Sequence, residues 1–526
     1  MHRRPTFLIL SGAYATAEIC AELGQLPPSF LPLGSERLFA HQVRLARSLQ
    51  ARVCITLPDD FVIDGLDAQL LAGYEVEILR VPSEISLVES LALAVSTCSP
   101  SEPVYVLHGD TMVELDDMAV LDAVAVAETD DFYSWADVDV VSGRITIREA
   151  EETALRRRIA CGYFTFSKAE LLLRCLEESS NFIGALNLYA EAHALTAVEA
   201  KRWLDFGHLP LFYRSRREAL VARSFNSITS DGTVLEKRSQ LAGKVSAEAA
   251  WYEAVPGRLR ASIPQFLGSF PGGYALEYLH LPTLADLAVF GRLPPYVWAR
   301  VLTRCLEVLD LAAAVRVPSG LDTDQIFRSL VSEKSRERVF AYLATTGETE
   351  DTRFMINERI MPPIGELIDS AISLISPTSR SDLSFMHGDF FFGNILFDFR
   401  SQRCKVVDPR GHLGDVVTPF GDVRYDVAKL AHSIVGRYDH LLLGYCEFNE
   451  LVPSQFRLSF PPSRALDALE ERFKASSVAG RKCWDPEMSR LTALLFFSAT
   501  PLHQDDPVRQ RRLLANGLRI LAEIDE

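Results

Sequence analysis

The chain has 526 residues, 48 % of them hydrophobic, which is too long for one hydrophobic core and apolar enough for two or three. A formal net charge of −16 argues against a protein that coats nucleic acid, because neutralising phosphates requires a basic face. No apolar stretch approaches the ~18 residues of a membrane span, and the short apolar run near the N-terminus is typical of a first strand rather than a signal peptide. The nine cysteines lack C-x-x-C or metal-ligand spacing, so we expect free thiols in a cytoplasmic protein.

Strands and helices are expected to alternate along the first half of the chain. This alternation predicts an α/β fold with a mostly parallel, doubly wound, Rossmann-like sheet. Such sheets bind ligands at the carboxyl ends of their strands, and Asp110 lies at such an end. The pattern predicts strands at 7–10, 53–57, 76–81, 103–107 and 162–166, helices from Ser35 through Ala46 and over 86–97, and a hairpin at 140–147.

Four segments of this half carry a resemblance to a known family. In chain order they are Gly12 after the first strand, 31–34 (Leu-Pro-Leu-Gly), 107–111 (Leu-His-Gly-Asp-Thr) and 203–207 (Trp-Leu-Asp-Phe-Gly). Together they resemble the nucleotidyltransferases that act on sugar 1-phosphates and phosphocholine. The resemblance implies that Asp110 and Asp205 hold Mg²⁺ between the nucleotide phosphates and the incoming phosphate, and that Gly12 lies against the nucleotide. Two carboxylates suit this hard cation, which prefers oxygen ligands.

One departure from that family concerns the loop that cradles the triphosphate. The family pattern is G-x-G-T-R followed by a lysine, whereas this chain has an uncharged run from Gly12 to Ala17, then Glu18, and Pro28 or Ser29 at the lysine position. Two alternatives therefore stay open for the first half. It is an active nucleotidyltransferase, or it is an inactive copy that serves as a scaffold or binds product.

The most informative stretch lies in the second half of the chain, at 385–397 followed by 406–409. Asp389 is followed five residues later by Asn394, and Asp408 comes after the next strand. Phosphoryl transfer needs a carboxylate that accepts the proton of the substrate hydroxyl and an Asn/Asp pair that holds Mg²⁺. Protein kinases carry this set as H-R-D-x-x-x-x-N and D-F-G. Here Gly388 replaces the arginine, and Pro409 follows the second aspartate.

These changes resemble the aminoglycoside phosphotransferase and choline kinase family, whose substrates are small molecules. The resemblance implies that Asp389, Asn394 and Asp408 are catalytic and that Asn394 and Asp408 are the metal ligands. It also implies ATP contacts from Lys237, on a strand at 234–238, and from Glu248 on the following helix. Lys244 and Glu253 are the alternatives for this pair.

Further segments agree with the same family. The strand 274–279 resembles the connection to the hinge, which places Glu277 beside adenine, and 224–232 resembles the loop over the phosphates. Asp426, in the segment 421–430, resembles the aspartate that steadies the catalytic loop. Apolar residues at helical spacing predict helices at 295–315, 355–375, 464–475 and 486–497.

The sequence thus predicts a nucleotidyltransferase-like domain at 1–218 and an α+β, two-lobed, protein-kinase-like domain at 219–526. The small lobe is expected at about 219–285 and the large helical lobe at about 286–526. The predicted protein is a bifunctional enzyme. One domain uses ATP to phosphorylate a small alcohol or sugar hydroxyl, and the other transfers a nucleotide from CTP or UTP to that product, which gives a CDP-alcohol or NDP-sugar for surface polysaccharide biosynthesis. The alternative is a single-activity kinase with an inactive first domain.

The sequence identifies neither the acceptor nor the oligomeric state. A choline-like cation would require an aromatic cage. Phe390, Phe391, Phe392 and Trp251 are candidates for it, although such residues are more typical of a hydrophobic core.

Overall fold

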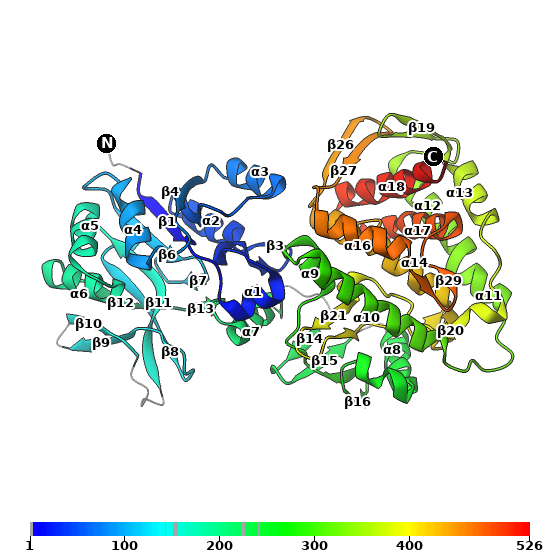
Figure 1. Ribbon diagram of the computed structural model, residues 1–526, viewed down its shortest axis with the longest axis horizontal. Coiled ribbons are helices and arrows are strands. Elements are labelled where there is room, and N and C mark those ends of the chain that lie inside the picture. Colours follow the sequence, from blue (N-terminus) through cyan, green and yellow to red (C-terminus); the bar gives the residue numbers. More distant parts are fainter. Residues whose placement is uncertain (1–3, 142–143, 151–155, 222–226, 240–241, 526) are drawn as a thin grey trace. The chain divides into compact units, whose positions relative to one another are not determined.

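The computed structural model describes residues 4–141, 144–150, 156–221, 227–239 and 242–525 (Figure 1). The chain divides into two compact units, Met1–Ala222 and Arg223–Glu526, here called unit 1 and unit 2. None of the helices within the described ranges combines the length and the apolar composition that crossing a membrane requires. All nine cysteines are free thiols.

Unit 1 is built on one large mixed sheet. Its parallel part has the order β6 (Val104–His108), β1 (Thr6–Leu10), β4 (Arg52–Pro58) and β5 (Glu77–Val81). Every residue of the central β1 is buried, as expected for a strand covered on both faces. The carboxyl ends of β1 and β6 therefore lie side by side, with Gly12 and Asp110 following them.

The other part of this sheet is antiparallel except for the parallel pairing of β12 (Thr196–Glu199) with β8 (Ala123–Thr129), so the sheet is mixed and not mostly parallel as expected. The predicted short strand at 162–166 is the end of the longer β11 (Arg157–Phe166), which runs antiparallel to β6 and to β8. The predicted hairpin is β9 (Asp137–Val141) with β10 (Arg144–Arg148). Such pairings join segments remote in sequence, which the local strand pattern does not specify.

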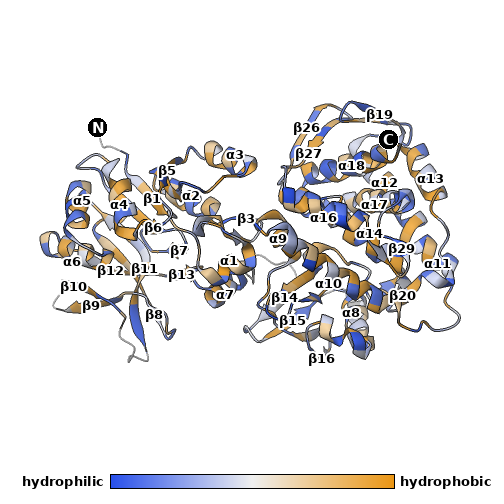
Figure 2. Cartoon of the chain, viewed as in Figure 1, coloured by the Kyte–Doolittle hydropathy of each residue, from blue (hydrophilic) through white to orange (hydrophobic). Residues whose placement is uncertain are grey.

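Helices of unit 1 cover this sheet. As predicted, α4 (Leu87–Ser96) begins after Ser86, whose side chain accepts from Glu89 N–H in a capping box. The helix predicted from Ser35 begins later, as α2 (Leu38–Ser48), because β3 (Glu36–Arg37) pairs with β2 (Pro32–Leu33). In Figure 2, α5 (Ala169–Glu178) carries both hydropathy colours, and its apolar residues Leu172 and Leu176 are buried. The remaining elements of unit 1 are α1 (Ala17–Leu23), α3 (Gly65–Gly73), α6 (Phe182–Ala192), α7 (Leu209–Val221), β7 (Thr111–Glu114) and β13 (Arg202–Asp205).

Unit 2 begins with an antiparallel sheet in the order β14 (Ser227–Ser230), β15 (Val234–Arg238), β17 (Gly273–Glu277) and β16 (Phe266–Phe270). Helix α8 (Ala242–Ala254) packs on it, with the Tyr252 ring stacked 5.8 Å from that of Phe266. Strand β15 has the predicted bounds. Part of the predicted loop over the phosphates, 224–226, lies outside the described residues.

The rest of unit 2 is mainly helical. Helix α17 (Pro486–Ala499) is almost entirely buried among α12 (Glu333–Thr346), α14 (Val423–Ile434) and α18 (Pro507–Ala522). The predicted helices at 295–315 and 464–475 are confirmed as α10 (Pro295–Ala313) and α16 (Arg464–Lys474). The other elements are α9 (Leu284–Val289), α11 (Thr323–Phe327), α15 (Tyr438–Leu443), β20 (Leu383–Phe385), β21 (Ile395–Asp398), β22 (Arg403–Val406), β23 (His412–Leu413), β24 (Val416–Val417), β25 (Phe420–Asp422), β26 (Glu447–Val452), β27 (Gln455–Ser459), β28 (Ser477–Val478) and β29 (Arg481–Lys482).

The prediction of a helix at 355–375 was wrong for the first half of this segment. This segment forms the hairpin β18 (Arg353–Ile356) and β19 (Arg359–Pro363), and only then α13 (Ile364–Ser373). Asn357 and Glu358 both have positive φ, at 47° and 72°, which ends any helix and makes the tight turn. Strand β27, about a hundred residues later, pairs with β18 and holds it extended.

Candidate active sites

A tight loop follows β20 in unit 2 and carries the predicted catalytic aspartate. Asp426 on α14 accepts the backbone N–H groups of His387 (2.7 Å) and Gly388 (2.8 Å), which fixes the path of this loop. Gly388 has φ +80°, and a Cβ there would lie 2.8 Å from Arg410 Cβ. The glycine that replaces the kinase arginine is therefore required by both backbone conformation and packing.

Asp389 and Asn394 are hydrogen-bonded to each other. Asn394 Nδ2 donates to Asp389 Oδ2 at 3.1 Å, so its Oδ1 is left as the oxygen for a cation. Lys429 Nζ lies 2.8 Å from Asp389 Oδ1. Burial alone raises the pKa of Asp389, but the Lys429 and Arg410 cations outweigh it and lower this pKa to about 2. Asp389 is consequently an oriented carboxylate anion.

Lys237 links the small sheet to the predicted metal ligands. Its Nζ lies 2.8 Å from Glu248 Oε2 and 3.1 Å from Asp408 Oδ1. The structure thus pairs Lys237 with Glu248, whereas the alternative Glu253 accepts from Ser269 at 3.4 Å. Burial lowers the pKa of Lys237, but Asp408 and Glu248 outweigh it, so the net shift is upward and the amine stays charged.

The segment after Asp408 packs directly on α8. Asp408 has φ +55°, a left-handed conformation that is rare for a non-glycine residue. Gly411 touches the helix backbone, since a Cβ there would lie 2.1 Å from Ala247 O. Trp251 Nε1 donates to Met386 O at 2.8 Å. These contacts hold Glu248, the loop after β20 and Asp408 together.

Glu277 is placed differently from the other predicted residues. It ends β17, is exposed, and does not line the cavity described below. Its N–H donates to Gln265 O (2.9 Å), and the next N–H, of Tyr278, donates to Thr233 O (2.8 Å). Backbone hydrogen bonds therefore already use the N–H groups of Glu277 and Tyr278, two of the donors in the segment that was expected to meet adenine.

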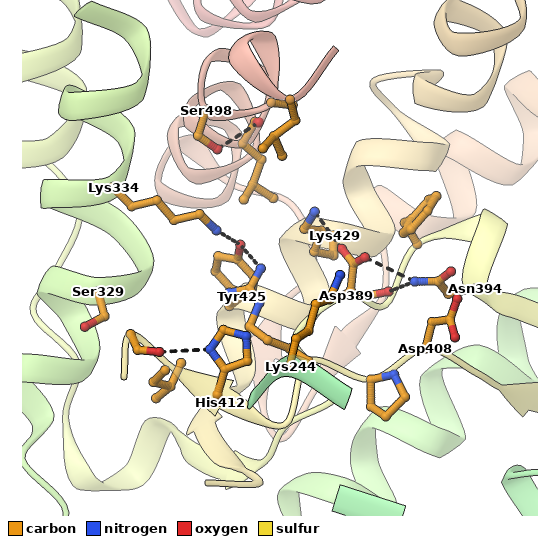
Figure 3. Close-up of a pocket in the computed structure, with 18 of the residues that line it drawn as sticks. Lys244, Ser329, Lys334, Asp389, Asn394, Asp408, His412, Tyr425, Lys429 and Ser498 are labelled. Atoms are coloured by element: carbon orange, nitrogen blue, oxygen red, sulfur yellow. Dashed lines mark hydrogen bonds and ion pairs between the residues drawn. The ribbon is translucent and has the colours of Figure 1, made fainter. Parts of the chain in front are cut away.

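A cavity of about 750 Å³ joins these groups (Figure 3). It also holds cationic side chains that belong to none of the predicted site residues. Lys429 lies within the segment 421–430, which contains Asp426, and Arg410 directly follows Pro409, so each of these two cations is close to a recognised motif. The lining residues from α12 have no motif around them. The lining includes Lys237, Lys244, Glu248, Ser329, Glu333, Lys334, Glu337, Arg338, Asp389, Phe391, Asn394, Asp408, Arg410, Tyr425 and Lys429.

Unit 1 brings its two predicted metal aspartates together. Asp110 follows β6, and Asp205 ends β13, which pairs antiparallel with β7 so that Asp205 lies opposite Thr111. Asp110 Oδ2 and Asp205 Oδ1 lie 2.6 Å and 3.4 Å from the position of a Cβ on Gly207. These oxygens are therefore no farther apart than the sum of those distances, so the two carboxylates are neighbours, as ligands of one cation have to be.

The electrostatics of this pair also fit a cation. Burial, and then the neighbouring Asp110 charge, raise the pKa of Asp205 to about 7. Gly207 N–H (2.7 Å) and Trp135 Nε1 (2.9 Å) donate to its carboxylate. Across the described ranges, no three His, Cys, Asp or Glu side chains gather as a metal cluster. A cation held by Asp110 and Asp205, or by Asn394 and Asp408, would therefore complete its coordination with water or phosphate oxygens.

Gly12, at the position of the family's glycine-rich loop, is closely packed. A Cβ on Gly12 would lie 2.6 Å from Val81 Cγ2, which explains the glycine by space alone. At the family's lysine position, Ser29 is buried, with its N–H donating to Ser11 Oγ (3.0 Å) and its hydroxyl to Gly109 O (3.3 Å). The structure therefore places no cation at that position.

Comparisons with known proteins give limited matches. No protein-family model and no curated protein matches the chain. Among solved structures, it is similar to CTP:phosphocholine cytidylyltransferase (LicC) from Streptococcus pneumoniae, with 11 % identity, 42 % of this chain and 100 % of the other covered, and a TM-score of 0.34. It is also similar to the inositol-1-phosphate CTP transferase from T. maritima, with 13 % identity, 42 % of this chain and 98 % of the other covered, and a TM-score of 0.34. HddC from Yersinia pseudotuberculosis is similar at 17 % identity, with 41 % of this chain and 99 % of the other covered, and a TM-score of 0.32. These matches cover the N-terminal part of the chain.

Proposed function

We propose that unit 2 is a Mg²⁺- and ATP-dependent kinase that phosphorylates a hydroxyl of a small molecule. The observation that carries this proposal is the position of Lys237 Nζ, 2.8 Å from Glu248 and 3.1 Å from Asp408, beside the hydrogen-bonded Asp389 and Asn394. Phosphoryl transfer needs little covalent chemistry from the protein and depends on positioning and charge, which these groups supply.

Each residue has a role that follows from its contacts. Lys237, held by Glu248, binds the nucleotide phosphates. Asp408 and Asn394 Oδ1 would hold Mg²⁺, which neutralises phosphate charge when bound. Asp389, oriented by Lys429 and Asn394, accepts a hydrogen bond from the acceptor hydroxyl. A carboxylate with a pKa of about 2 is a weak base, so it receives the proton only after the oxygen has bonded to phosphorus and become strongly acidic.

The test is an assay of phosphate transfer from ATP. The full chain is incubated with Mg²⁺, ATP and a panel of amino alcohols, polyols, sugars and their phosphate esters, and products are read by mass spectrometry. Product formation that requires Mg²⁺ and yields one ADP per phosphate transferred supports the kinase. Absence of both transfer and Mg-ATP binding would contradict it.

We propose nucleotidyl transfer as a second activity, in unit 1. Its support is the convergence of Asp110 and Asp205, where a half-buried and a buried carboxylate lie side by side and favour a cation. CTP or UTP would then react with the phosphorylated product to give a CDP-alcohol or NDP-sugar for surface polysaccharide, in the cytoplasm. The uncharged loop after Gly12 favours the rival, an inactive scaffold. Pyrophosphate release with one nucleotide decides between them.

A further inference from the structure

The part of the unit 2 cavity beyond Asp389 is lined by cations from three separate elements. Lys334 and Arg338 lie one turn apart on the same face of α12. Arg410 comes from the loop after Asp408, and Lys429 from α14. Figure 3 shows Lys334 reaching toward Tyr425, with Lys429 beside Asp389. Convergence of four cations on one hollow is costly unless something balances their charge.

The protein itself balances only part of this charge. Lys334 Nζ (2.9 Å) and Arg410 Nη2 (3.0 Å) share one acceptor, the Tyr425 hydroxyl. Arg338 Nη1 donates to the Ser498 carbonyl at 3.3 Å, and Lys429 alone has a carboxylate partner, Asp389. Among the described residues, no Asp or Glu lies within ion-pair distance of Lys334, Arg338 or Arg410.

Glu248 and Asp408 also line the cavity, but they pair with Lys237. The two remaining carboxylates of the lining, both on α12, are exposed. The Glu333 side chain is 60 % exposed and lies 3.6 Å from Arg328, and Glu337 is exposed on the same helix. Water screens such charges far more than those of the half-buried Lys334 and Arg338. The inner surface beyond Asp389 thus remains positively charged.

The ionisation of the lining groups agrees with a positive field. Burial lowers the pKa of Lys334 to about 8, helped by the neighbouring Arg410 and Lys429. Burial would raise the pKa of Tyr425, but Arg410, Lys334 and Lys429 outweigh it and lower this pKa to about 6. Even with Tyr425 as phenolate and with Asp389 and the neighbouring Asp426 both ionised, the four cations exceed the three anions.

We propose that the acceptor of the kinase is itself a phosphomonoester, a phosphorylated sugar or polyol whose phosphate is bound by Lys334, Arg338 and Arg410 while its free hydroxyl meets Asp389. This inference rests on the proposed kinase function of unit 2. A phosphate suits the site better than a carboxylate, because a tetrahedral dianion accepts hydrogen bonds from several directions at once.

The proposed reaction transfers the γ-phosphoryl group of ATP to the acceptor hydroxyl. A bond forms between the hydroxyl oxygen and the γ-phosphorus, the bond from that phosphorus to the β,γ-bridging oxygen breaks, and ADP leaves. The hydroxyl proton passes to Asp389. The phosphate already on the acceptor is unchanged, so the product carries two phosphates.

The same surface disfavours a choline-like acceptor. Phe390, Phe392 and Trp251 are 1–3 % exposed and belong to the core, so they form no cage. Phe391 does line the cavity, but Lys429 Nζ already lies 5.9 Å from its ring centroid. A quaternary ammonium there would meet a cation instead of an empty aromatic face.

The first experiment measures anion binding without catalysis. Inorganic phosphate is titrated by calorimetry into the full chain saturated with Mg-ADP, for the wild type, Lys334→Met, Arg338→Met and the control Arg336→Met. Arg336 lies on the same helix, but its side chain is 44 % exposed and pairs with Asp369. We expect each cavity variant to weaken phosphate binding by about tenfold, as for loss of one charge-assisted hydrogen bond, and the control to leave it unchanged. No phosphate binding by the wild type, or equal binding by all four proteins, would overturn the proposal.

The second experiment compares acceptors in matched sets: glycerol with glycerol 3-phosphate, and mannose with mannose 6-phosphate and with mannonate. We expect kcat/KM at least tenfold higher for the phosphomonoester, with Lys334→Met raising its KM while the KM for ATP is unchanged. A preference for the neutral compound or the carboxylate, or a rise in the KM for ATP alone, would overturn the phosphomonoester assignment and leave the kinase intact. Mg-ATP binding without phosphate binding identifies a failure of this inference, whereas loss of both identifies a failure of the kinase itself.

Discussion

Lys237 on β15 and Glu248 on α8 form an ion pair, with Nζ 2.8 Å from Oε2. The Glu248 side chain is 2 % exposed and also accepts from the Tyr274 hydroxyl at 2.9 Å. A buried carboxylate with two such donors has one stable orientation, because any other leaves a charge unpaired. It therefore fixes the Lys237 amine at the cavity, beside Asp408.

The first prediction concerns the acceptor side of the reaction. Asp389→Asn removes the charge that orients the hydroxyl and receives its proton, and should lower kinase turnover by a factor on the order of 10² or more. ATP binding should be nearly unchanged. Turnover and Mg-ATP affinity are measured for this variant and for Asp505→Asn, which alters a carboxylate that is 72 % exposed. Turnover within a few-fold of wild type would remove Asp389 from this role.

The second prediction concerns the metal. Asp408→Ala should abolish Mg-dependent phosphate transfer and weaken Mg-ATP binding, because the phosphate charge loses its bridging cation. Calorimetry with Mg-ATP and with metal-free ATP separates this effect from loss of Lys237 positioning, since only the Mg-dependent part of the affinity should disappear. Unchanged Mg-ATP affinity together with normal turnover would contradict the assignment.

The third prediction concerns stability. Gly388→Ala should destabilise unit 2 by more than the about 1–2 kcal/mol of a left-handed alanine, because the new Cβ lies 2.8 Å from Arg410 Cβ. Gly347→Ala is the matched control, with φ +76° and nothing within 4 Å of its Cβ. The thermal transition that Mg-ATP raises reports on unit 2. Equal shifts for the two variants would show that the Arg410 contact has no cost.

The fourth prediction concerns pH and rests on the phosphomonoester inference. Lys334 faces Arg410, Tyr425 and Lys429, and its pKa is lowered to about 8. Above that pH the amine is neutral, so kcat/KM for a phosphorylated acceptor should fall as pH rises through about 8. Lys334→Arg should keep its charge and lose this fall. A wild-type profile that is flat from pH 7 to 9.5, or a fall retained in the arginine variant, would assign the titration elsewhere.

The fifth prediction separates the two units. Asp110→Asn should abolish pyrophosphate release from CTP or UTP and leave ADP formation unchanged, whereas Asp389→Asn should do the reverse when the phosphorylated acceptor is supplied. If no nucleotide yields pyrophosphate across a broad set of phosphorylated acceptors, unit 1 is a scaffold. If both variants lose both reactions, the assignment to two separate sites is wrong.

Sequence alone was sufficient where the geometry depends on neighbours along the chain. The spacing predicted that Asp389, Asn394 and Asp408 belong to one group, because one loop and the hairpin that follows it carry all three. The Ser86 cap and strand β15 were likewise local, since hydrogen bonds within a few residues and a short apolar run specify them.

Tertiary structure decided what depends on remote partners. The pairing of Lys237 with Glu248 follows from the packing of α8 on Met386 and Gly411. The hairpin at 353–363 exists because β27 pairs with it, against an apparently helical pattern. Lys334 and Arg338 look like ordinary surface residues of a helix, and only the packing of α12 on α17 turns them toward the cavity, where Lys334 meets Tyr425 of α14. Side chains that converge from separate elements leave no periodic pattern in a sequence, so this cluster of cations was visible only in the folded chain.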